Sequence, residues 1–355
     1  MKWTLVVSNG LDNVLTSLAE GRDVYALERL ESGNYKLKQA SEWLPEQHTL
    51  GAFRSIEPLK ALFFPAREFI GTWQKLAIRE PMPERIVFGV KNCDLSSLAI
   101  YDHVFLQGVC PDPYYAEARE KTILVSTDCS SQLDVCFCPG VGEQPYAEKG
   151  FDINIAETPA GYVLETGTAR GAKLLQSAQQ YLKEAGPELL EVFEQQRAGR
   201  YEELVEHSEA HGLKPGTDLQ AAVEGSFEAD LWKDFARDCV ECGACNFICC
   251  TCHCFLLADG VDADGMPART KLWDACLYEG FARTAGGGNP RPLRAERLRN
   301  RFDKKFSFFP QVLGRYACDG CGRCTEACIA NIDIRDVLRR AVDESDALHA
   351  HTGDH

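Results

Sequence analysis

The sequence has 355 residues, a length that predicts two or three domains. Its net charge of −15 argues against nucleic acid as the main partner, because nucleic-acid-binding proteins carry a basic surface. No apolar run approaches the roughly 18 residues of a membrane span, and residues 1–10 lack the cleavage site of a secretory signal. The unusual count is 17 cysteines, which we interpret as metal or redox chemistry in a reduced, cytoplasmic protein.

The first expected elements form an N-terminal α/β domain over residues 1–165. Residues 85–91 and 122–127 are short β-branched runs bounded by polar residues, which is typical of buried strands. Residues 94–105 lie between them and have helical spacing, with Asp94 as the predicted N-cap.

Two cysteines and a hairpin belong to the same domain. Cys93 follows the first of these strands and Cys129 follows the second. Open α/β sheets place their sites at the carboxyl ends of strands, so both cysteines are candidate site residues. Residues 151–167 alternate around a Pro-Ala-Gly turn and predict a β-hairpin.

Residues 166–236 predict a helical connector whose acidic stretch is a solvated helix face. His207 and His211 are spaced i, i+4 within it. The zinc-protease pattern needs Glu directly after the first His, and Ser208 stands there, so we reject that site.

The cysteines fall into two groups. Five lie between residues 93 and 138, none lies in residues 139–238, and the other twelve lie between residues 239 and 328. This distribution indicates two cysteine-using domains separated by a cysteine-free connector.

Two runs in the later group share one spacing. Residues 239–249 read CVECGACNFIC and residues 318–328 read CDGCGRCTEAC. This spacing places three thiolates around one cubane cluster, and the fourth cysteine ligates the other cluster in two-cluster ferredoxins. We therefore assign one [4Fe–4S] cluster to Cys239, Cys242, Cys245 and Cys328, and a second to Cys318, Cys321, Cys324 and Cys249.

Details of the runs favour iron–sulfur ligation over zinc, the main alternative. Zinc needs two CxxC pairs rather than two complete runs. Gly243 and Gly322 follow the second cysteine of each run and suit a tight loop whose N–H groups point at sulfur. The proline usual after the fourth cysteine is replaced by Cys250 and Ile329, which leaves the ligands intact.

Residues 237–343 are thus expected to form a mainly helical, dicluster ferredoxin-like domain, followed by a tail at 344–355. Residues 283–305 hold eight Lys or Arg against two acidic residues, a net charge of +6. Positive charge beside an anionic cluster raises its reduction potential. An exposed basic helix, or a docking patch for an acidic partner, is the alternative interpretation.

Beyond the runs, the chain resembles the iron–sulfur beta subunits of cytosolic sulfhydrogenases and the A subunit of anaerobic sulfite reductase. WDAC at 273–276 and AGGGNPR at 285–291 are the most specific matches. The others are GVKNCDL at 89–95, DPYY at 112–115, CFC at 136–138 followed by Gly140 and Gly142, CCTCHCF at 249–255, and Lys304-Lys305-Phe306.

The resemblance implies an α+β subunit that passes electrons between a flavin-bearing subunit and a separate catalytic subunit. It also helps to favour a third cluster in the N-terminal domain, against the alternative of reduced buried thiols, with the ligands Cys93, Cys129, Cys136 and Cys138. Three further cysteines match the family pattern: Cys252, Cys254 and Cys276. Two roles are open for them, as neighbours of the cluster ligands or as alternative ligands. We treat Cys110 and Cys250 as incidental.

The sequence therefore predicts a non-catalytic electron-transfer subunit. Its expected partners are a flavin-containing reductase subunit and a catalytic subunit of hydrogenase, sulfite reductase or heterodisulfide reductase type. One alternative is a thiol-based disulfide or sulfur reductase that uses Cys252, Cys254 or Cys276. The other is a redox sensor whose clusters control an interaction.

Overall fold

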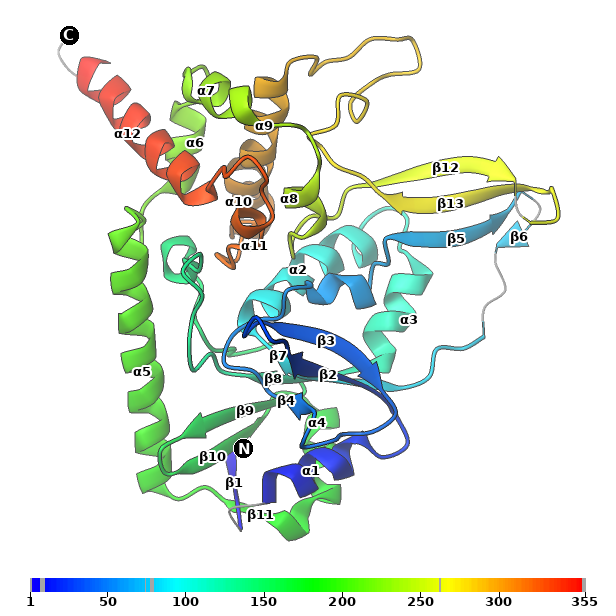
Figure 1. Cartoon of the computed structure of the whole chain (residues 1–355), viewed down its shortest axis with the longest axis vertical. Coiled ribbons are helices and arrows are strands. Elements are labelled where there is room, and N and C mark those ends of the chain that lie inside the picture. Colours follow the sequence, from blue (N-terminus) through cyan, green and yellow to red (C-terminus); the bar gives the residue numbers. More distant parts are fainter. Residues whose placement is uncertain (1, 7–9, 74, 77–79, 262, 353–355) are drawn as a thin grey trace. The chain divides into compact units, whose positions relative to one another are not determined.

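The computed structural model describes residues 2–6, 10–73, 75–76, 80–261 and 263–352 (Figure 1). Contacts divide the chain into two compact units. Unit 1 comprises Met1–Phe63, Pro81–Cys138 and Glu143–Glu206, and unit 2 comprises Phe64–Glu80, Pro139–Gly142 and His207–His355. The predicted α+β class, with a sheet domain first and a helical region later, is confirmed.

Unit 1 is built on a nine-stranded mixed sheet. In spatial order it contains β11 (Leu182–Glu184), β1 (Lys2–Leu5), β10 (Gly161–Thr166), β9 (Ile153–Thr158), β8 (Thr122–Thr127), β7 (Arg85–Val90), β2 (Asp23–Arg29) and β3 (Tyr35–Ala40), and β4 (His48–Thr49) pairs with β2. The two predicted buried strands are β7 and β8, which pair in parallel at the centre and are buried along their whole length. Because β8 also pairs in parallel with β9, the carboxyl ends of the three strands lie at one edge.

Helices α1 (Gly10–Ala19), α2 (Asn92–Leu106), α3 (Pro113–Lys121) and α4 (Ala169–Ser177) belong to the same unit, with 3₁₀ turns at Leu59–Leu62 and Gln179–Tyr181. Apolar side chains of α1 and α4 pack with Ile86 of β7 and Ile123 of β8 in one core. This packing buries one stripe of each helix and one face of the sheet.

The predicted N-cap of α2 is wrong. The helix begins at Asn92 with Lys91 at the N-cap position, so Asp94 already lies in the first turn. Its carboxylate accepts a hydrogen bond from the Leu59 N–H at 3.0 Å instead of capping its own helix. The predicted hairpin at 151–167 is confirmed as the antiparallel pair β9 and β10, joined by Pro159 and Ala160.

The predicted connector is mainly helical, with α5 (Pro187–Ala210), α6 (Leu219–Gly225) and α7 (Leu231–Asp238). Its residues do not form a unit of their own. Residues up to 206 contact unit 1, and those from 207 onwards contact unit 2.

Unit 2 combines short helices with a four-stranded sheet. The helices after α7 are α8 (Ala244–Phe247), α9 (Arg294–Asp303), a π-helical turn (Lys304–Phe308), α10 (Phe309–Leu313), α11 (Arg323–Glu326) and α12 (Ile334–Thr352). The sheet order is β12 (Phe255–Val261), β13 (Pro267–Trp273), β5 (Arg67–Thr72) and β6 (Lys75–Leu76). Residues 64–80 belong to this unit because β5 pairs with β13, and a buried ion pair between Glu68 and Lys271 joins the two strands.

None of the described helices combines the length and the apolar character that crossing a membrane requires.

Candidate iron–sulfur centres

The first cysteine run surrounds a cavity in unit 2. Cys239 follows the last turn of α7, Cys242 lies in the next loop, and Cys245 is on α8. All three line the cavity together with Cys328, which comes from the end of the second run. The structure thus brings together the four residues predicted for the first cluster, and Cys324 also borders this cavity.

The second predicted ligand set also gathers in unit 2. Cys318 lies near Cys324 and Cys249, close enough for their charges to interact. Cys324 in turn is close to Cys321. The fourth cysteine of each run therefore lies with the first three of the other run, as two-cluster ferredoxins require.

Gly243 and Gly322 shape the two loops in the same way. Both have a left-handed backbone, with φ of 73° and 69°, and each immediately precedes a short helix, α8 or α11. A Cβ atom on Gly243 would lie 3.0 Å from the Cβ of Ala275 and 2.9 Å from the hydroxyl of Tyr278. The tight loop expected at these glycines is confirmed, and at Gly243 a side chain has no room.

Three buried cations recur along α9 and the π-helical turn, and two of them, Arg301 and Lys305, lie beside the cysteine sets. Arg297, Arg301 and Lys305 recur at i, i+4 and i+8 along α9 and the π-helical turn, and all three are under 5% exposed. Arg301 lines the first cavity and donates to the Cys245 carbonyl at 3.2 Å, while its Nε has no hydrogen-bond partner. Arg297 instead forms a buried ion pair with Glu241 and donates to the Leu277 carbonyl.

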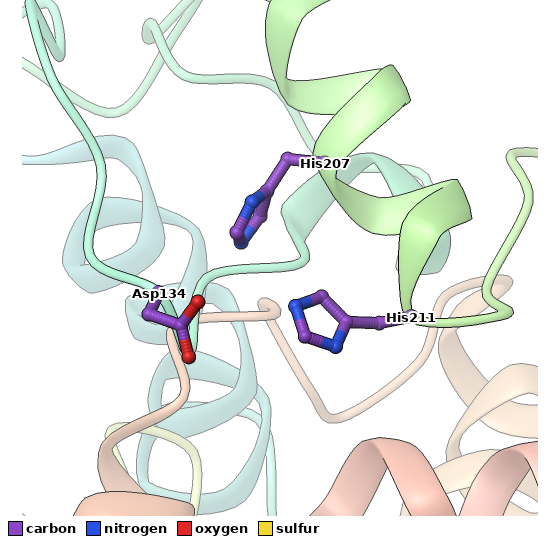
Figure 2. Close-up of side chains that lie close together, drawn as sticks. All are labelled: Asp134, His207 and His211. Carbon is purple, nitrogen blue, oxygen red and sulfur yellow. The ribbon is translucent and has the colours of Figure 1, made fainter.

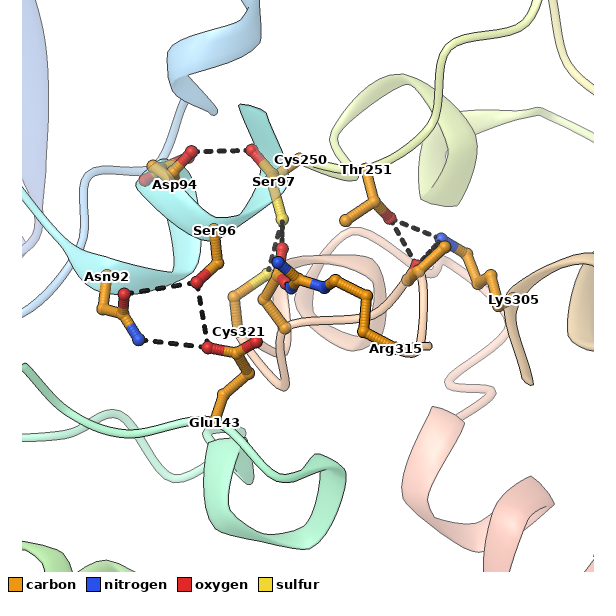
Figure 3. A network of polar contacts seen from close by, with 12 residues as sticks. Asn92, Asp94, Ser96, Ser97, Glu143, Cys250, Thr251, Lys305, Arg315 and Cys321 are labelled. Carbon is orange, nitrogen blue, oxygen red and sulfur yellow. Dashed lines mark hydrogen bonds and ion pairs between the residues drawn. The ribbon is translucent and has the colours of Figure 1, made fainter. Parts of the chain in front are cut away.

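Lys305 contacts the second cysteine set directly. Its Nζ lies 3.4 Å from Cys249 Sγ. It donates to Thr251 Oγ1 at 2.7 Å (Figure 3) and to the Ala317 carbonyl at 2.8 Å. Burial lowers the pKa of Lys305, but the neighbouring Cys249 and Cys252 sulfurs raise it well above its ordinary value. The ammonium is therefore a permanent positive charge at this thiolate.

This chemistry fits anionic [4Fe–4S] clusters. Burial raises the pKa of Cys245 to about 12 and also raises the pKa of Cys324, so without a metal these thiols favour the neutral form. Meanwhile, a buried guanidinium with an orphaned N–H is costly unless an anion lies beside it. A cluster held by four thiolates supplies that negative charge and keeps the sulfurs deprotonated.

Three other thiols of unit 2 gather around the buried amide of Asn246. Its Nδ2 lies 3.1 Å from Cys276 Sγ and 3.9 Å from Cys252 Sγ. The interaction with Cys254 lowers the pKa of Cys276 to about 6 despite the burial of this thiol. Cys252 instead interacts with Cys249, and this interaction raises the pKa of Cys252 well above its ordinary value.

The early cysteines of unit 1 come together at the carboxyl ends of β7 and β8. Cys93 is in the first turn of α2 and Cys129 follows β8, and both lie near the charge of the buried Lys91. Cys138 lies close to Cys136 and Cys129 in the loop that follows. The structure thus gathers all four residues predicted for a third cluster.

The loop that carries these cysteines is anchored at both ends. The Lys91 ammonium donates to Thr127 Oγ1 at 2.5 Å and to the Gly51 carbonyl at 2.7 Å. Beyond Cys138, the Glu143 carboxylate accepts hydrogen bonds from Asn92 and Ser96 on α2 at 3.2 and 2.9 Å (Figure 3).

The rejected histidine motif lies at the end of α5. Figure 2 shows His207 and His211 close together on neighbouring turns. Their ring centroids lie 5.1 Å apart. Ser208, which replaces the glutamate of the protease pattern, is buried and donates to the Leu213 carbonyl at 2.7 Å. It thus contributes to the end of the helix rather than to catalysis.

Sequence reasoning missed the individual cations. It identified a basic segment but not that Arg301 and Lys305 face the cysteine sets, and it did not single out Lys91 as a functional residue. Arg301 and Lys305 could have been found from the sequence. They are four residues apart, and basic side chains at that spacing lie on one face of a helix.

Comparison with known proteins gives two matches. The family described as a 4Fe-4S dicluster domain matches residues 238–332. Sulfhydrogenase 2 subunit beta of Pyrococcus furiosus is 31% identical over 295 residues, which is 82% of this chain and 85% of that protein. No solved structure matches the chain.

Proposed function

Because the chain belongs to the family of sulfhydrogenase beta subunits, we propose that it is an iron–sulfur electron-transfer subunit of a multisubunit oxidoreductase. The observation that carries this proposal is the pair of interlocked cysteine sets beside the buried cations Arg301 and Lys305. A [4Fe–4S] cluster takes up and gives back one electron at a time, without other chemistry.

The ligands follow from the grouping of the thiols. One cluster is held by Cys239, Cys242, Cys245 and Cys328, and a second is held by Cys318, Cys321, Cys324 and Cys249. Arg301 lies at the first set and Lys305 at the second, so each set has its own buried positive charge. These charges stabilise the reduced, more negative state of each centre.

The first set is the one closer to solvent, and we assign it the exchange of electrons with a partner. Cys242 is exposed, as are Val240 at 58% and Ile329 at 72% on the rim of the same cavity. In the second set, Cys249 and Cys321 are buried. Exposed apolar residues at a rim are typical of a surface that a partner covers.

A third cluster in unit 1 is part of the proposal, with the ligands Cys93, Cys129, Cys136 and Cys138. Their convergence at the carboxyl ends of the parallel strands, next to the buried ammonium of Lys91, supports it. Lys91 faces Cys129 and Cys93, as Lys305 faces Cys249, but burial lowers the pKa of Lys91 whereas the pKa of Lys305 is raised.

The partners we propose are a flavin-containing reductase subunit and a catalytic subunit of hydrogenase, sulfite reductase or heterodisulfide reductase type. The edge strand β12 supports the existence of a partner, because Phe255, Leu256 and Leu257 are exposed on it. A long apolar edge strand that faces solvent is otherwise an aggregation hazard.

Counting iron and acid-labile sulfide on anaerobically purified protein tests the number of clusters. We expect roughly twelve iron atoms per chain, since three cubanes hold four each. About eight would remove the cluster of unit 1 from the proposal, and fewer than about four would refute the electron-transfer function itself.

Serine variants test the ligand sets separately. Cys242→Ser should lower the iron count of unit 2, and Cys136→Ser should lower that of unit 1. Cys110→Ser is the matched control, because Cys110 is exposed and belongs to neither set. Identifying the subunits that co-purify with the native protein then decides between the partner types.

A further inference from the structure

Unit 1 contains a cavity of about 440 Å³ to which the proposed function assigns no role. Part of its wall is formed by Thr127, Asp128 and Cys129, at the carboxyl end of β8, where open α/β sheets place their ligands. The rest of the wall comes from α1, residues 35–52, the β9–β10 hairpin and α5, all within unit 1. Cys129 is the one proposed cluster ligand among the lining residues, so the cavity is not the space that the four cysteines enclose.

Aromatic side chains form the inner wall of the cavity. Tyr35, Trp43 and His48 line it, and each is at most 7% exposed. The ring centroids of Trp43 and His48 lie 5.5 Å apart, and the Trp43 indole N–H donates to Asp12 Oδ1 at 3.1 Å. A rigid aromatic wall in a cavity of this size favours a flat, ring-shaped organic molecule.

His48 offers a hydrogen-bond donor in this wall. The Leu44 N–H donates to His48 Nδ1 at 3.0 Å, and the His48 N–H donates back to the Leu44 carbonyl at 2.8 Å, so the ring is fixed. Burial lowers the pKa of His48 and keeps the ring neutral. Because Nδ1 accepts a hydrogen bond, the proton of the neutral ring is on Nε2. Within the described part of the chain, this Nε2–H has no hydrogen-bond partner.

Two further polar groups of the lining lack partners. The Tyr35 hydroxyl makes no hydrogen bond to any residue that the structure describes. On α5, Gln196 Nε2 donates to the Glu157 carbonyl at 2.6 Å, which fixes the orientation of the amide, and its Oε1 is buried without a partner. Leaving a buried polar group unpaired is costly, so these groups indicate that a bound molecule completes them.

We propose that this cavity binds an uncharged, planar ring compound with an imide edge, in which an N–H lies between two carbonyl groups. Such an edge presents two acceptors and one donor. The cavity supplies the complement, with donors on His48 and Tyr35 and an acceptor on Gln196. Flavin rings and uracil both carry this edge. The proposal goes beyond the electron-transfer function and does not depend on it.

The charges around the cavity favour an uncharged ligand. Asp12 and Glu157 line the cavity and are exposed, so they lie at its mouth. Asp128 is already paired with Arg197, at 2.6 Å. Neither lysine nor arginine occurs among the described residues that line the cavity. A phosphate or carboxylate group on the ligand would therefore meet negative charge without a counter-ion.

Equilibrium dialysis of the anaerobic holoprotein at low ionic strength tests the proposal, with riboflavin and uridine as the probes. Riboflavin carries the imide edge on three fused rings and uridine carries it on one, so the two probes distinguish the sources of this edge. We expect one of them to bind, with one molecule per chain. Its N3-methyl derivative, which lacks the imide N–H, should bind about tenfold more weakly. The phosphorylated form, FMN or UMP, should also bind more weakly.

Three outcomes of the dialysis would overturn the proposal. Binding of neither riboflavin nor uridine would show that water alone fills the cavity. Equal affinity for the N3-methyl derivative would show that no acceptor reads the imide edge. Tighter binding of the phosphorylated form would show that the ligand is not uncharged.

Variants locate the bound probe. Tyr35→Phe removes one donor and keeps the ring, and Gln196→Leu removes the acceptor, so each should weaken binding about tenfold. Tyr201→Phe is the matched control, because Tyr201 lies on α5 but not in the lining of the cavity, and it should bind the probe as wild type does. Unchanged iron content shows that each variant is folded. Equal affinity of Tyr35→Phe, Gln196→Leu and wild type would place the probe elsewhere and overturn the proposal.

Discussion

Lys305 shows how one side chain can set the properties of a centre. The residue is 4% exposed, and its ammonium lies 3.4 Å from Cys249 Sγ and donates to Thr251 and to the Ala317 carbonyl. Hydrogen bonds and positive charge at a ligand sulfur raise a cluster's reduction potential, because they stabilise the added electron. The neighbouring Lys304 is exposed and lies over the ring of Phe308.

Replacing Lys305 with Met should lower the reduction potential of one cluster by on the order of tens of millivolts, since the buried charge and its hydrogen bond are both lost. Redox titration followed by EPR measures the potential, and iron content shows whether the cluster is retained. Lys304→Met is the matched control and should leave both potentials unchanged. Equal potentials in Lys305→Met and wild type at full iron content would contradict the assignment.

At the scale of elements, a left-handed glycine follows the second cysteine of each run and begins the short helix that carries the third. Gly243→Ala places a Cβ against Ala275 and Tyr278 and forces a φ of 73°, which costs an L-residue about 1–2 kcal/mol. We expect this variant to bind less iron than wild type, because Cys242 and Cys245 flank the glycine. Iron and acid-labile sulfide counts measure the loss.

Gly260→Ala is the control for that substitution. Gly260 lies on β12 with no heavy atom within 4 Å of an added Cβ and without a positive φ. The Gly260→Ala variant should contain as much iron as wild type. An iron loss as large as in Gly243→Ala would show that the loop geometry at Gly243 does not cause the loss there.

The elements also show what the sequence could predict. Strands β7 and β8 and the hairpin of β9 and β10 were predictable, because β-branched runs and turn residues are local signals. The N-cap of α2 was not, since Asp94 is recruited by the Leu59 N–H, a partner 35 residues away. The pairing of β5 with β13 was missed for the same reason, because no local pattern encodes a strand partner some 200 residues distant.

The candidate sites likewise have one part that the local sequence predicts and another that depends on residues distant in the chain. The spacing of the cysteine runs predicted which thiols gather, because ligand geometry dictates that spacing. The contact of Cys276 with the amide of Asn246, 30 residues away in the chain, is not encoded by any local pattern.

At the scale of the whole molecule, the two units should respond differently to loss of iron. In unit 2, removing the clusters leaves buried Arg301 and Lys305 without the anions they face, so we expect faster hydrogen exchange in α8, α9 and α11. Strands β7 and β8, with their continuous apolar core, should stay protected. Hydrogen-exchange mass spectrometry before and after anaerobic chelation measures both.

The same experiment reports on the loop of unit 1. If residues 129–138 hold a cluster, their exchange should rise on chelation together with that of unit 2. Unchanged exchange there, with iron lost from unit 2, would count against the third cluster.

In the proposed ligand sets, each cysteine run supplies its fourth cysteine to the cluster of the other run. This arrangement has a consequence for how the clusters are assembled. Cys328 stands in the cavity of the first run, and Cys249 stands with Cys318 and Cys324 of the second. With the ligand sets proposed above, neither cluster would be completed by a single stretch of chain, and the last ligand of each would arrive only when the segment carrying the other is in place. Such a chain matures as an all-or-none pair, so a partly loaded subunit with one finished centre should be a rare species.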